Sequence, residues 1–220
     1  LDVGAGRGIA SYALAKEGLQ VTALEPDPSG LVGAAAIRKL AHESALPIAV
    51  VEEFSERLPF ADASFDLVFA RAVLHHTRDL GTACREFFRV LKPGGRLIAI
   101  REHVISREED LPRFLALHPL HKFYGGEHAY LLHQYVNAIY RSGFGQIKII
   151  RSWESSLNYA PYNLATLKTE LVRRLSDIAG LKAVAAVFLG LPGIWPIVRK
   201  ILDRLDNRPG RLYSFIATRP

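Results

Sequence analysis

Two features near the start of the chain could bind a small-molecule ligand. Three glycines, Gly4, Gly6 and Gly8, occupy alternate positions directly after the apolar run Leu1-Asp2-Val3. Glycine tolerates positive φ and lets a ligand approach the main chain closely. The acidic Glu25 follows at the end of the next predicted strand. Because a carboxylate there can accept hydrogen bonds from both hydroxyls of a ribose, the two features together predict a nucleoside site.

The residues around the glycine-rich turn disfavour two other kinds of nucleotide site. A dinucleotide-binding fingerprint needs glycine or alanine three positions after its second glycine, so that helix and strand pack closely. That position holds the bulky, branched Ile9, which argues against a nicotinamide-dependent oxidoreductase. A Walker phosphate loop is excluded as well, because no Gly-Lys-Ser/Thr follows.

Strands and helices alternate through the first hundred residues. Apolar alternation and turn signals predict strands at about 1–3, 19–24, 47–51, 65–70 and 96–100. Helices are expected over 9–17, from an N-cap at Asp27 or Ser29 to about 41, and over 80–91, where Lys92-Pro93-Gly94-Gly95 is a turn signal. This order predicts an α/β fold with a Rossmann-like, doubly wound sheet, whose strands bind ligands at their carboxyl ends.

The pattern changes after Arg101. Residues 102–128 predict a loop with a short helix, followed by a helix over 130–141 and a strand over 146–152. Residues 161–206 predict a mainly helical insertion, interrupted at Gly190-Leu191-Pro192-Gly193 and again at Pro196. A strand over 212–218 brings the sheet to seven strands, which we expect to be parallel except for the last.

The composition is that of a globular protein, and it does not identify a binding partner. Hydrophobic residues make up 49% and charged residues 23% of the 220 residues, as in globular proteins. Residues 1–110 hold 13 Lys and Arg against 16 Asp and Glu, whereas residues 111–220 hold 15 against 6. These basic residues are scattered, which fits a solvated face as well as an anionic partner. The lone Cys84 excludes an internal disulfide and suits a reducing compartment such as the cytoplasm.

Six ordered motifs carry a family resemblance. They are Leu1 to Gly8, Glu25-Pro26, Leu58-Pro59-Phe60, Ser64-Phe65-Asp66-Leu67-Val68, Leu74-His75-His76 and Arg89-Val90-Leu91-Lys92-Pro93-Gly94-Gly95-Arg96-Leu97. Together they resemble the class I S-adenosylmethionine-dependent methyltransferases, in the branch that includes ubiquinone- and menaquinone-biosynthesis enzymes. The resemblance is strong over 1–102 and continues weakly through 127–130 and 142–144. Since residue 1 already lies in a predicted strand and the sequence contains no methionine, we expect the natural start to be missing.

The resemblance implies a division of one domain, 1–220, into parts. Residues 1–102 would bind S-adenosylmethionine, and 103–160 would contribute the substrate side and the sixth strand. Residues 161–206 would form the helical insertion or cap, and 207–220 the last strand. The implied reaction is methyl transfer to an O, N or C nucleophile of a small molecule, with apolar or lipid-linked acceptors among those expected.

The resemblance also assigns roles to residues of the cofactor site. The loop from Gly4 through Ala5 and Gly6 to Gly8 would bend around the methionine part of the cofactor, and Asp2 would help to hold its amino group. Glu25 would bind the ribose hydroxyls, with Pro26 bordering the adenine.

One adenine contact departs from the family pattern. The acidic residue usual there falls at Phe54, followed by Ser55. Phenylalanine cannot accept a hydrogen bond from the adenine amine, so we expect Phe54 to stack on the ring. Ser55 or a displaced Glu53 would then supply the polar contact.

Residues beside the transferable methyl are expected at the end of the fourth strand. Ala70 and Arg71 occupy this place, and Arg71 would face either an acidic substrate group or a neighbouring carboxylate. Attack on a sulfonium methyl depends mainly on positioning, and a general base is needed only when the nucleophile must lose a proton. Histidine titrates near neutrality, so weak candidates for that base are His75, His76, His103 and His128. Their spacing along the chain predicts no metal site.

Nucleic acid is a less expected substrate. No Asn/Asp-Pro-Pro-Tyr/Phe stretch follows the fourth strand, and aromatic residues do not alternate with Lys and Arg as a stacking platform would require. The alternatives left open are a catalytically inactive binding module, which Phe54 favours, and an RNA-modifying methyltransferase that uses the basic half.

The uncharged run 183–198 has two interpretations. Flanked by Lys182 and by Arg199-Lys200, it is too short for a spanning helix, which needs about 20 residues. It predicts either a helical cap packed on the sheet or an interfacial hairpin that contacts a membrane surface.

Overall fold

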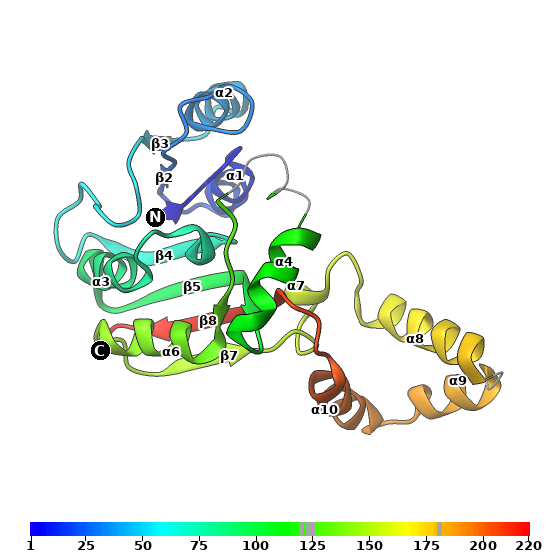
Figure 1. Ribbon diagram of the computed structural model, residues 1–220. Coiled ribbons are helices and arrows are strands. Elements are labelled where there is room, and N and C mark those ends of the chain that lie inside the picture. The colour runs from blue at the N-terminus through cyan, green and yellow to red at the C-terminus, as the bar shows by residue number, and fades with distance from the viewer. Residues whose placement is uncertain (119–120, 122–125, 180–181) are drawn as a thin grey trace.

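A single eight-stranded sheet forms the centre of the computed structural model, which describes residues 1–118, 121, 126–179 and 182–220 (Figure 1). The strands are β1 (Asp2–Val3), β2 (Val21–Leu24), β3 (Ile48–Val51), β4 (Phe65–Arg71), β5 (Leu91–Ile105), β6 (Tyr130–Leu131), β7 (Ile147–Ile150) and β8 (Arg211–Thr218). Their order is β3-β2-β1-β4-β5-β8-β7, with β6 pairing beside β5. Among the strands of the described residues, only β8 is antiparallel to its neighbours. The predicted α/β class and the antiparallel last strand are confirmed, with β6 as an additional strand.

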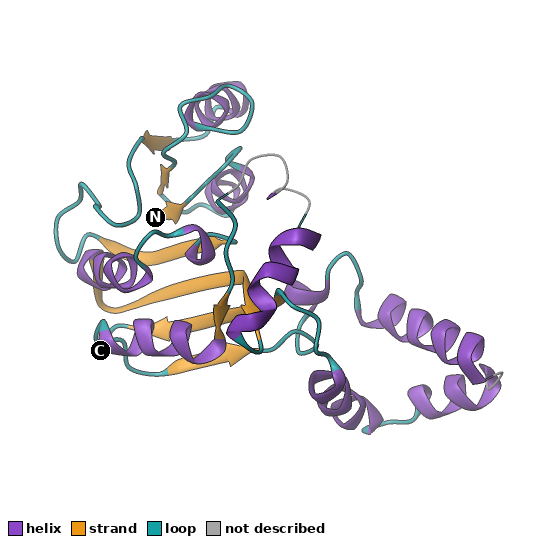
Figure 2. Ribbon diagram, viewed as in Figure 1, coloured by secondary structure: helices purple, strands orange, loops and turns teal. Residues whose placement is uncertain are grey.

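Helices connect the strands (Figure 2). They are α1 (Ile9–Lys16), α2 (Ala34–Ser44), α3 (Leu80–Val90), α4 (Leu111–Leu117), α6 (Leu132–Arg141), α7 (Ser156–Tyr159), α8 (Leu164–Ala179), α9 (Lys182–Gly190) and α10 (Ile194–Leu205), with short 3₁₀ turns η1 (Leu74–His76) and η2 (Glu108–Asp110). The chain reverses its direction across the sheet at β1, which pairs with both β2 and β4. Such a switch point is where open α/β sheets bind ligands.

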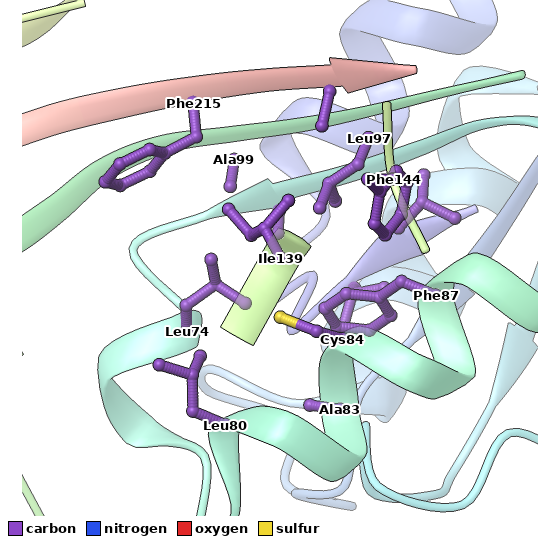
Figure 3. Packing of buried hydrophobic residues seen from close by; sticks show 14 of the residues in the cluster. Leu74, Leu80, Ala83, Cys84, Phe87, Leu97, Ala99, Ile139, Phe144 and Phe215 are labelled. Atoms are coloured by element: carbon purple, nitrogen blue, oxygen red, sulfur yellow. The ribbon is translucent and has the colours of Figure 1, made fainter. Parts of the chain in front are cut away.

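Helix α3 illustrates how sequence determines an element and its packing. The Asp79 side chain accepts a hydrogen bond from the backbone N–H of Thr82 and caps the helix. Five apolar residues recur at helical spacing on its buried face: Leu80, Ala83, Cys84, Phe87 and Val90. They pack with residues of β5, α6 and β8 into the main core (Figure 3). Cys84 is therefore a core residue, and burial raises the pKa of its thiol to about 12.

Strand β5 is longer than the sequence predicts because two irregularities lie within its span. Lys92-Pro93-Gly94-Gly95, predicted to be a turn, lies within β5 as an irregularity: β4 pairs before it at Leu91 and again after it at Arg96. A second shift follows Ala99, where Arg101 adopts a φ of 62°. The strand then continues to Ile105, so the expectation of a loop from residue 102 was wrong. Because of this extension, Glu102 and His103 belong to β5 and lie in the sheet.

Two other helix predictions need correction. The helix expected from Asp27 or Ser29 begins only at Ala34, because the Asp27 carboxylate accepts hydrogen bonds from the Ser29 N–H and hydroxyl and stabilises a turn. Pro196 does not interrupt the insertion, since it lies in the first turn of α10, where its missing N–H is not needed.

The helical insertion extends away from the sheet. Helices α8 and α9 pack on each other, and Figure 1 shows them projecting beyond the ends of the strands. Helix α9 therefore does not meet the expectation that 183–198 forms a cap packed on the sheet. Among the described residues, no helix combines the length and apolarity that crossing a membrane requires.

Candidate active site

The glycine-rich turn joins β1 to α1. Gly4, Gly6 and Gly8 all have positive φ, at 59°, 55° and 79°. A side chain at Gly4 would place its Cβ 2.7 Å from the nearer methyl of Val73, whereas the space around Gly6 is open. Gly8 begins α1, and a Cβ there would lie 3.0 Å from Ile37. Backbone conformation favours glycine at all three positions, and close packing favours it at Gly4 and Gly8.

Glu25 holds this turn from the end of β2. One carboxylate oxygen accepts the Gly6 N–H at 2.7 Å, and the other accepts the Asp27 N–H at 3.0 Å. Each oxygen keeps a further lone pair for a ligand. Glu25 is buried but lines a cavity of about 360 Å³. It can therefore position the loop and accept ligand hydroxyls at the same time.

This cavity lies at the carboxyl ends of β1, β2 and β3, as predicted for the nucleoside site. Because several of the predicted cofactor residues lie in its wall, we call it the cofactor cavity. Its lining is Val3, Gly4, Leu24, Glu25, Pro26, Glu53, Phe54, Ser55, Glu56, Ala72, Val73, His76, Thr77 and Arg78. Of the residues predicted for the cofactor, those in the lining are Gly4, Glu25, Pro26, Phe54 and Ser55. Those outside it are Asp2, Ala5, Gly6, Gly8, Ala70 and Arg71.

Asp2 lies beneath the turn instead of in the cavity. Its carboxylate is buried and accepts the Ser11 hydroxyl at 2.5 Å. Burial raises the pKa of Asp2 to about 6, against the opposing hydrogen bond from Ser11. The geometry thus gives Asp2 a clear part in tying β1 to α1.

The predicted residues at the end of β4 are displaced by two positions. Ala70 is fully buried in the sheet, and Arg71 is exposed. Ala72 and Val73 line the cavity in their place, because Ala72 adopts a φ of 57° and turns the chain toward it.

The side of the cavity formed after β3 is more polar than the sequence indicates. The Arg78 guanidinium lies over the Phe54 ring, 5.0 Å from its centroid. Glu56 accepts the backbone N–H of Arg78 at 2.7 Å and the Ser55 hydroxyl at 3.0 Å. Phe54 is about half exposed, so its ring remains available for stacking. Glu56 and Arg78 were missed because their contacts join segments far apart in the sequence.

A cluster of histidines and carboxylates lies next to this cavity. The Nδ1 atom of His75 is 2.7 Å from Glu102, whose carboxylate also accepts the backbone N–H groups of Val73 and His75. On the opposite side, His75 Nε2 lies 3.6 Å from Glu127. All three of His75, Glu102 and Glu127 are buried. Sequence reasoning missed both carboxylates, although Glu102 directly precedes a candidate histidine.

Three more histidines lie around His75, Glu102 and Glu127. The ring of His76 lies against that of His75 and lines the cofactor cavity. His103 lies on the other side of His75, at 4.7 Å between ring centroids, and its Nδ1 is 2.8 Å from the Gly210 carbonyl oxygen. His118 Nδ1 is 3.7 Å from Glu127. The fourth candidate, His128, instead lies against the ring of Tyr130.

The surroundings of these histidines shift their pKa values in opposite directions. Burial lowers the pKa of His75, but Glu102 and Glu127 outweigh this effect and raise it to about 9. Burial lowers the pKa of His103 to about 4, and the charge of His75 acts in the same direction. Burial and His75 likewise lower the pKa of His76, and burial lowers that of His128. Near neutral pH, therefore, a charged His75 lies between the neutral rings of His76 and His103.

A second cavity, of about 370 Å³, adjoins the cluster through His103. Its lining comes from β5, the segment after β7, α7, α8, the segment before β8 and the start of β8: His103, Ser152, Trp153, Asn158, Tyr159, Ala160, Tyr162, Leu167, Glu170, Leu171, Arg174, Arg208, Pro209, Gly210, Arg211 and Leu212. The histidine cluster thus contacts the cofactor cavity through His76 and the second cavity through His103.

Substitution of Gly4 by alanine is expected to lower the free energy of unfolding by about 1–3 kcal/mol, through positive-φ strain and the clash with the stiff Val73 side chain. Urea denaturation measures this change. The matched control is Gly18→Ala, where φ is also positive, at 87°, but nothing lies within 4 Å. Equal losses in the two variants would contradict the close packing of Gly4 on Val73.

Raising the pH is expected to remove stability that His75 provides. Its pKa in the fold, about 9, lies above the ordinary 6.5, so the contribution is complete below pH 6.5 and is lost as the pH rises through 9. The groups facing it are Glu102, Glu127, His76 and His103. The loss is on the order of 3 kcal/mol and can be followed by urea denaturation in EDTA. His75→Gln should flatten this part of the profile, and an unchanged slope would contradict the assignment.

Comparisons with known proteins agree with this geometry. A protein-family profile described as "Methyltransferase domain" matches residues 1–99. The uncharacterized protein YafE of Escherichia coli K12 is 55% identical over 47 residues, 21% of this chain and 23% of that protein. A ubiquinone biosynthesis O-methyltransferase of Methylobacterium sp. (strain 4-46) is 33% identical over 99 residues, 45% of this chain and 39% of that enzyme. The matched region therefore spans well under half the length of either relative.

A solved structure extends the likeness of fold to the whole chain. Geranyl diphosphate C-methyltransferase from Streptomyces coelicolor A3(2) superposes with a TM-score of 0.67 at 16% identity, covering 100% of this chain and 71% of that one. At this identity the likeness concerns the fold alone. Together with the domain matched over residues 1–99, the sheet order and the cavity at its switch point, it shows that the chain is similar to the class I S-adenosylmethionine-dependent methyltransferases.

Proposed function

We propose that this protein transfers the methyl group of S-adenosylmethionine to a small-molecule acceptor. The observation that carries the proposal is the 360 Å³ cavity at the carboxyl ends of β1, β2 and β3, with Glu25 and the glycine-rich turn in its wall. The methionine part would lie along Gly4 to Gly8. Glu25 would accept the ribose hydroxyls, and Phe54 would stack on the adenine.

We assign the acceptor to the second cavity. Its volume of about 370 Å³ suits a small molecule, and its wall combines aromatic and apolar side chains with charged ones (for example Trp153, Tyr159, Leu171 and Arg174). An apolar or aromatic acceptor with one polar group fits such a wall. An oxygen nucleophile is our first choice, because the Methylobacterium relative is named as an O-methyltransferase.

The reaction asks mainly for alignment of the acceptor with the sulfonium methyl. The acceptor atom attacks the methyl carbon as the carbon–sulfur bond breaks, and the bonding pair stays on sulfur as S-adenosylhomocysteine forms. A hydroxyl acceptor also loses its proton. We assign this step to the histidine cluster, because it contacts both cavities through His76 and His103.

Transfer of a radioactive methyl group tests the proposal. The full chain is incubated with methyl-labelled S-adenosylmethionine and a panel of phenols, carboxylic acids and amines, and extracted products are counted. Acceptor-dependent labelling that S-adenosylhomocysteine inhibits supports the proposal. Binding of S-adenosylhomocysteine with no transfer to any class would favour the inactive binding module, and transfer to RNA but not to small molecules would favour the RNA-modifying alternative.

We also propose that α9 and α10 contact an anionic membrane surface, where a lipid-like acceptor could be collected. Exposed apolar side chains on and between these helices include Val187, Phe188, Leu191, Ile197, Ile201 and Leu205. Arg199, Lys200 and Arg204 lie on α10 among them. Apolar side chains together with basic ones are the combination that favours binding at the interface of anionic bilayers.

Co-sedimentation with vesicles tests this contact. Wild-type protein is expected to bind phosphatidylserine-containing vesicles at low salt, and Ile197→Glu together with Ile201→Glu should lower the bound fraction at least fivefold. Leu117→Glu, at an exposed apolar position on α4, serves as the control. Absence of wild-type binding would reject the membrane contact.

A further inference from the structure

The histidine cluster contains a set of atoms suited to holding a metal ion. One ligand atom from each of His75, His103 and Glu127 lies within 4.8 Å of the other two. These residues come from η1, from the extended end of β5 and from the segment before β6. Their wide separation in the sequence explains why spacing along the chain predicts no metal site.

Each of the two histidines is oriented through its Nδ1 atom. His75 Nδ1 is hydrogen-bonded to the Glu102 carboxylate at 2.7 Å, and His103 Nδ1 donates to the Gly210 carbonyl oxygen at 2.8 Å. A neutral imidazole that donates through Nδ1 carries its lone pair on Nε2, so a metal ion would bind His75 in place of the proton that its Nε2 holds near neutral pH. Metal-binding histidines are typically held in this way, by a carboxylate or a carbonyl oxygen on the far nitrogen.

Glu127 is the strongest indication of a ligand. Only 7% of this residue is exposed, yet its Oε2 atom makes no hydrogen bond within the described part of the chain. The nearest imidazole nitrogens, on His75 and His76, are 3.6 and 3.7 Å away, too far for hydrogen bonds. His118 Nδ1, at 3.7 Å from the other oxygen, likewise makes none there. Buried polar atoms are normally satisfied, so this convergence calls for a bound partner.

We propose that His75, His103 and Glu127 bind a divalent transition-metal ion, with His118 as a fourth ligand. Two or three imidazoles with one carboxylate suit Zn²⁺ and its neighbours in the transition series. The same set does not suit Mg²⁺ or Ca²⁺, which prefer oxygen ligands. Binding requires the ligand atoms to draw together, because metal–nitrogen bonds are about 2.0–2.1 Å.

The position of the ion suggests its use, and this part rests on the proposed function. His103 lines the second cavity, so an ion on its Nε2 would lie beside an acceptor bound there. A divalent ion that binds a hydroxyl oxygen lowers its pKa and so favours its anion. The ion would then prepare an oxygen nucleophile for attack on the methyl group.

Metal binding can be measured without any assay of activity. The full chain, stripped with EDTA and dialysed, is titrated with Zn²⁺ by calorimetry and with Co²⁺ by visible absorption. The structure predicts one ion per chain and Co²⁺ bands of a site with nitrogen and oxygen ligands. Glu127→Gln and His103→Ala are each expected to weaken Zn²⁺ binding at least 10- to 100-fold. Glu127→Gln keeps the shape of the side chain, and thermal melts verify that both variants fold.

His133→Ala is the matched control, since His133 is exposed on α6. It should bind Zn²⁺ like the wild type. A wild-type chain without saturable binding, or Glu127→Gln and His133→Ala with equal affinities, would overturn the metal site. S-adenosylhomocysteine is titrated into the same samples, so that failure of the metal site can be told apart from failure of the cofactor site.

Discussion

Replacement of Glu102 by alanine is expected to lower the free energy of unfolding by about 3–5 kcal/mol. Glu102 is fully buried, and its carboxylate accepts three hydrogen bonds, from the N–H groups of Val73 and His75 and from the His75 ring. Alanine would leave these three donors without an acceptor. Glu127 would then be the carboxylate that remains beside His75. Urea denaturation near pH 7 measures the effect.

The control for this substitution is Glu109→Ala, at an exposed position of η2. A change within about 0.5 kcal/mol is expected there. Glu102→Gln should fall between the two, because its amide oxygen can still accept a hydrogen bond. If Glu102→Ala were as stable as Glu109→Ala, the buried carboxylate would not organise the cluster as the structure indicates.

Replacement of Glu25 by alanine is expected to weaken binding of S-adenosylhomocysteine about 10- to 100-fold. The variant loses the acceptor for the ribose hydroxyls and also the hydrogen bonds to the N–H groups of Gly6 and Asp27. Both losses act on the cofactor cavity. Calorimetric titration at a temperature where the variant is folded measures the change.

Glu17→Ala tests whether a lost surface charge alone could produce this effect. Glu17 is an exposed carboxylate at the end of α1, outside the cavity. The Glu17→Ala variant should therefore bind S-adenosylhomocysteine with the affinity of the wild type. Unchanged affinity in Glu25→Ala would contradict the assignment of Glu25 to the ribose.

Local sequence patterns were sufficient to predict most of the fold. Alternating apolar residues, glycine turns and helical spacing are short-range signals, and they predict seven of the eight strands. They also pointed to the cofactor cavity, because Gly4 and Glu25 each follow directly from the end of a strand.

The histidine cluster depends instead on long-range geometry. The irregularity at Arg101 carries Glu102 into contact with His75, and Glu127 reaches the same point from a segment some 25 residues farther along. No local pattern encodes either contact. For the same reason the sequence predicts Ala70 and Arg71, and not Ala72 and Val73, at the cavity beside the end of β4. The positive φ of Ala72 cannot be predicted from its residue type.

Calorimetric titration of the wild-type chain with S-adenosylhomocysteine shows directly whether the cavity beside Glu25 binds the cofactor. The cofactor cavity predicts saturable binding at one molecule per chain, with no competition from NAD. Absence of heat at ligand concentrations up to about 1 mM, where even weak specific binding is measurable, together with failure to protect the chain in thermal melts, would contradict the assignment of this cavity to S-adenosylmethionine.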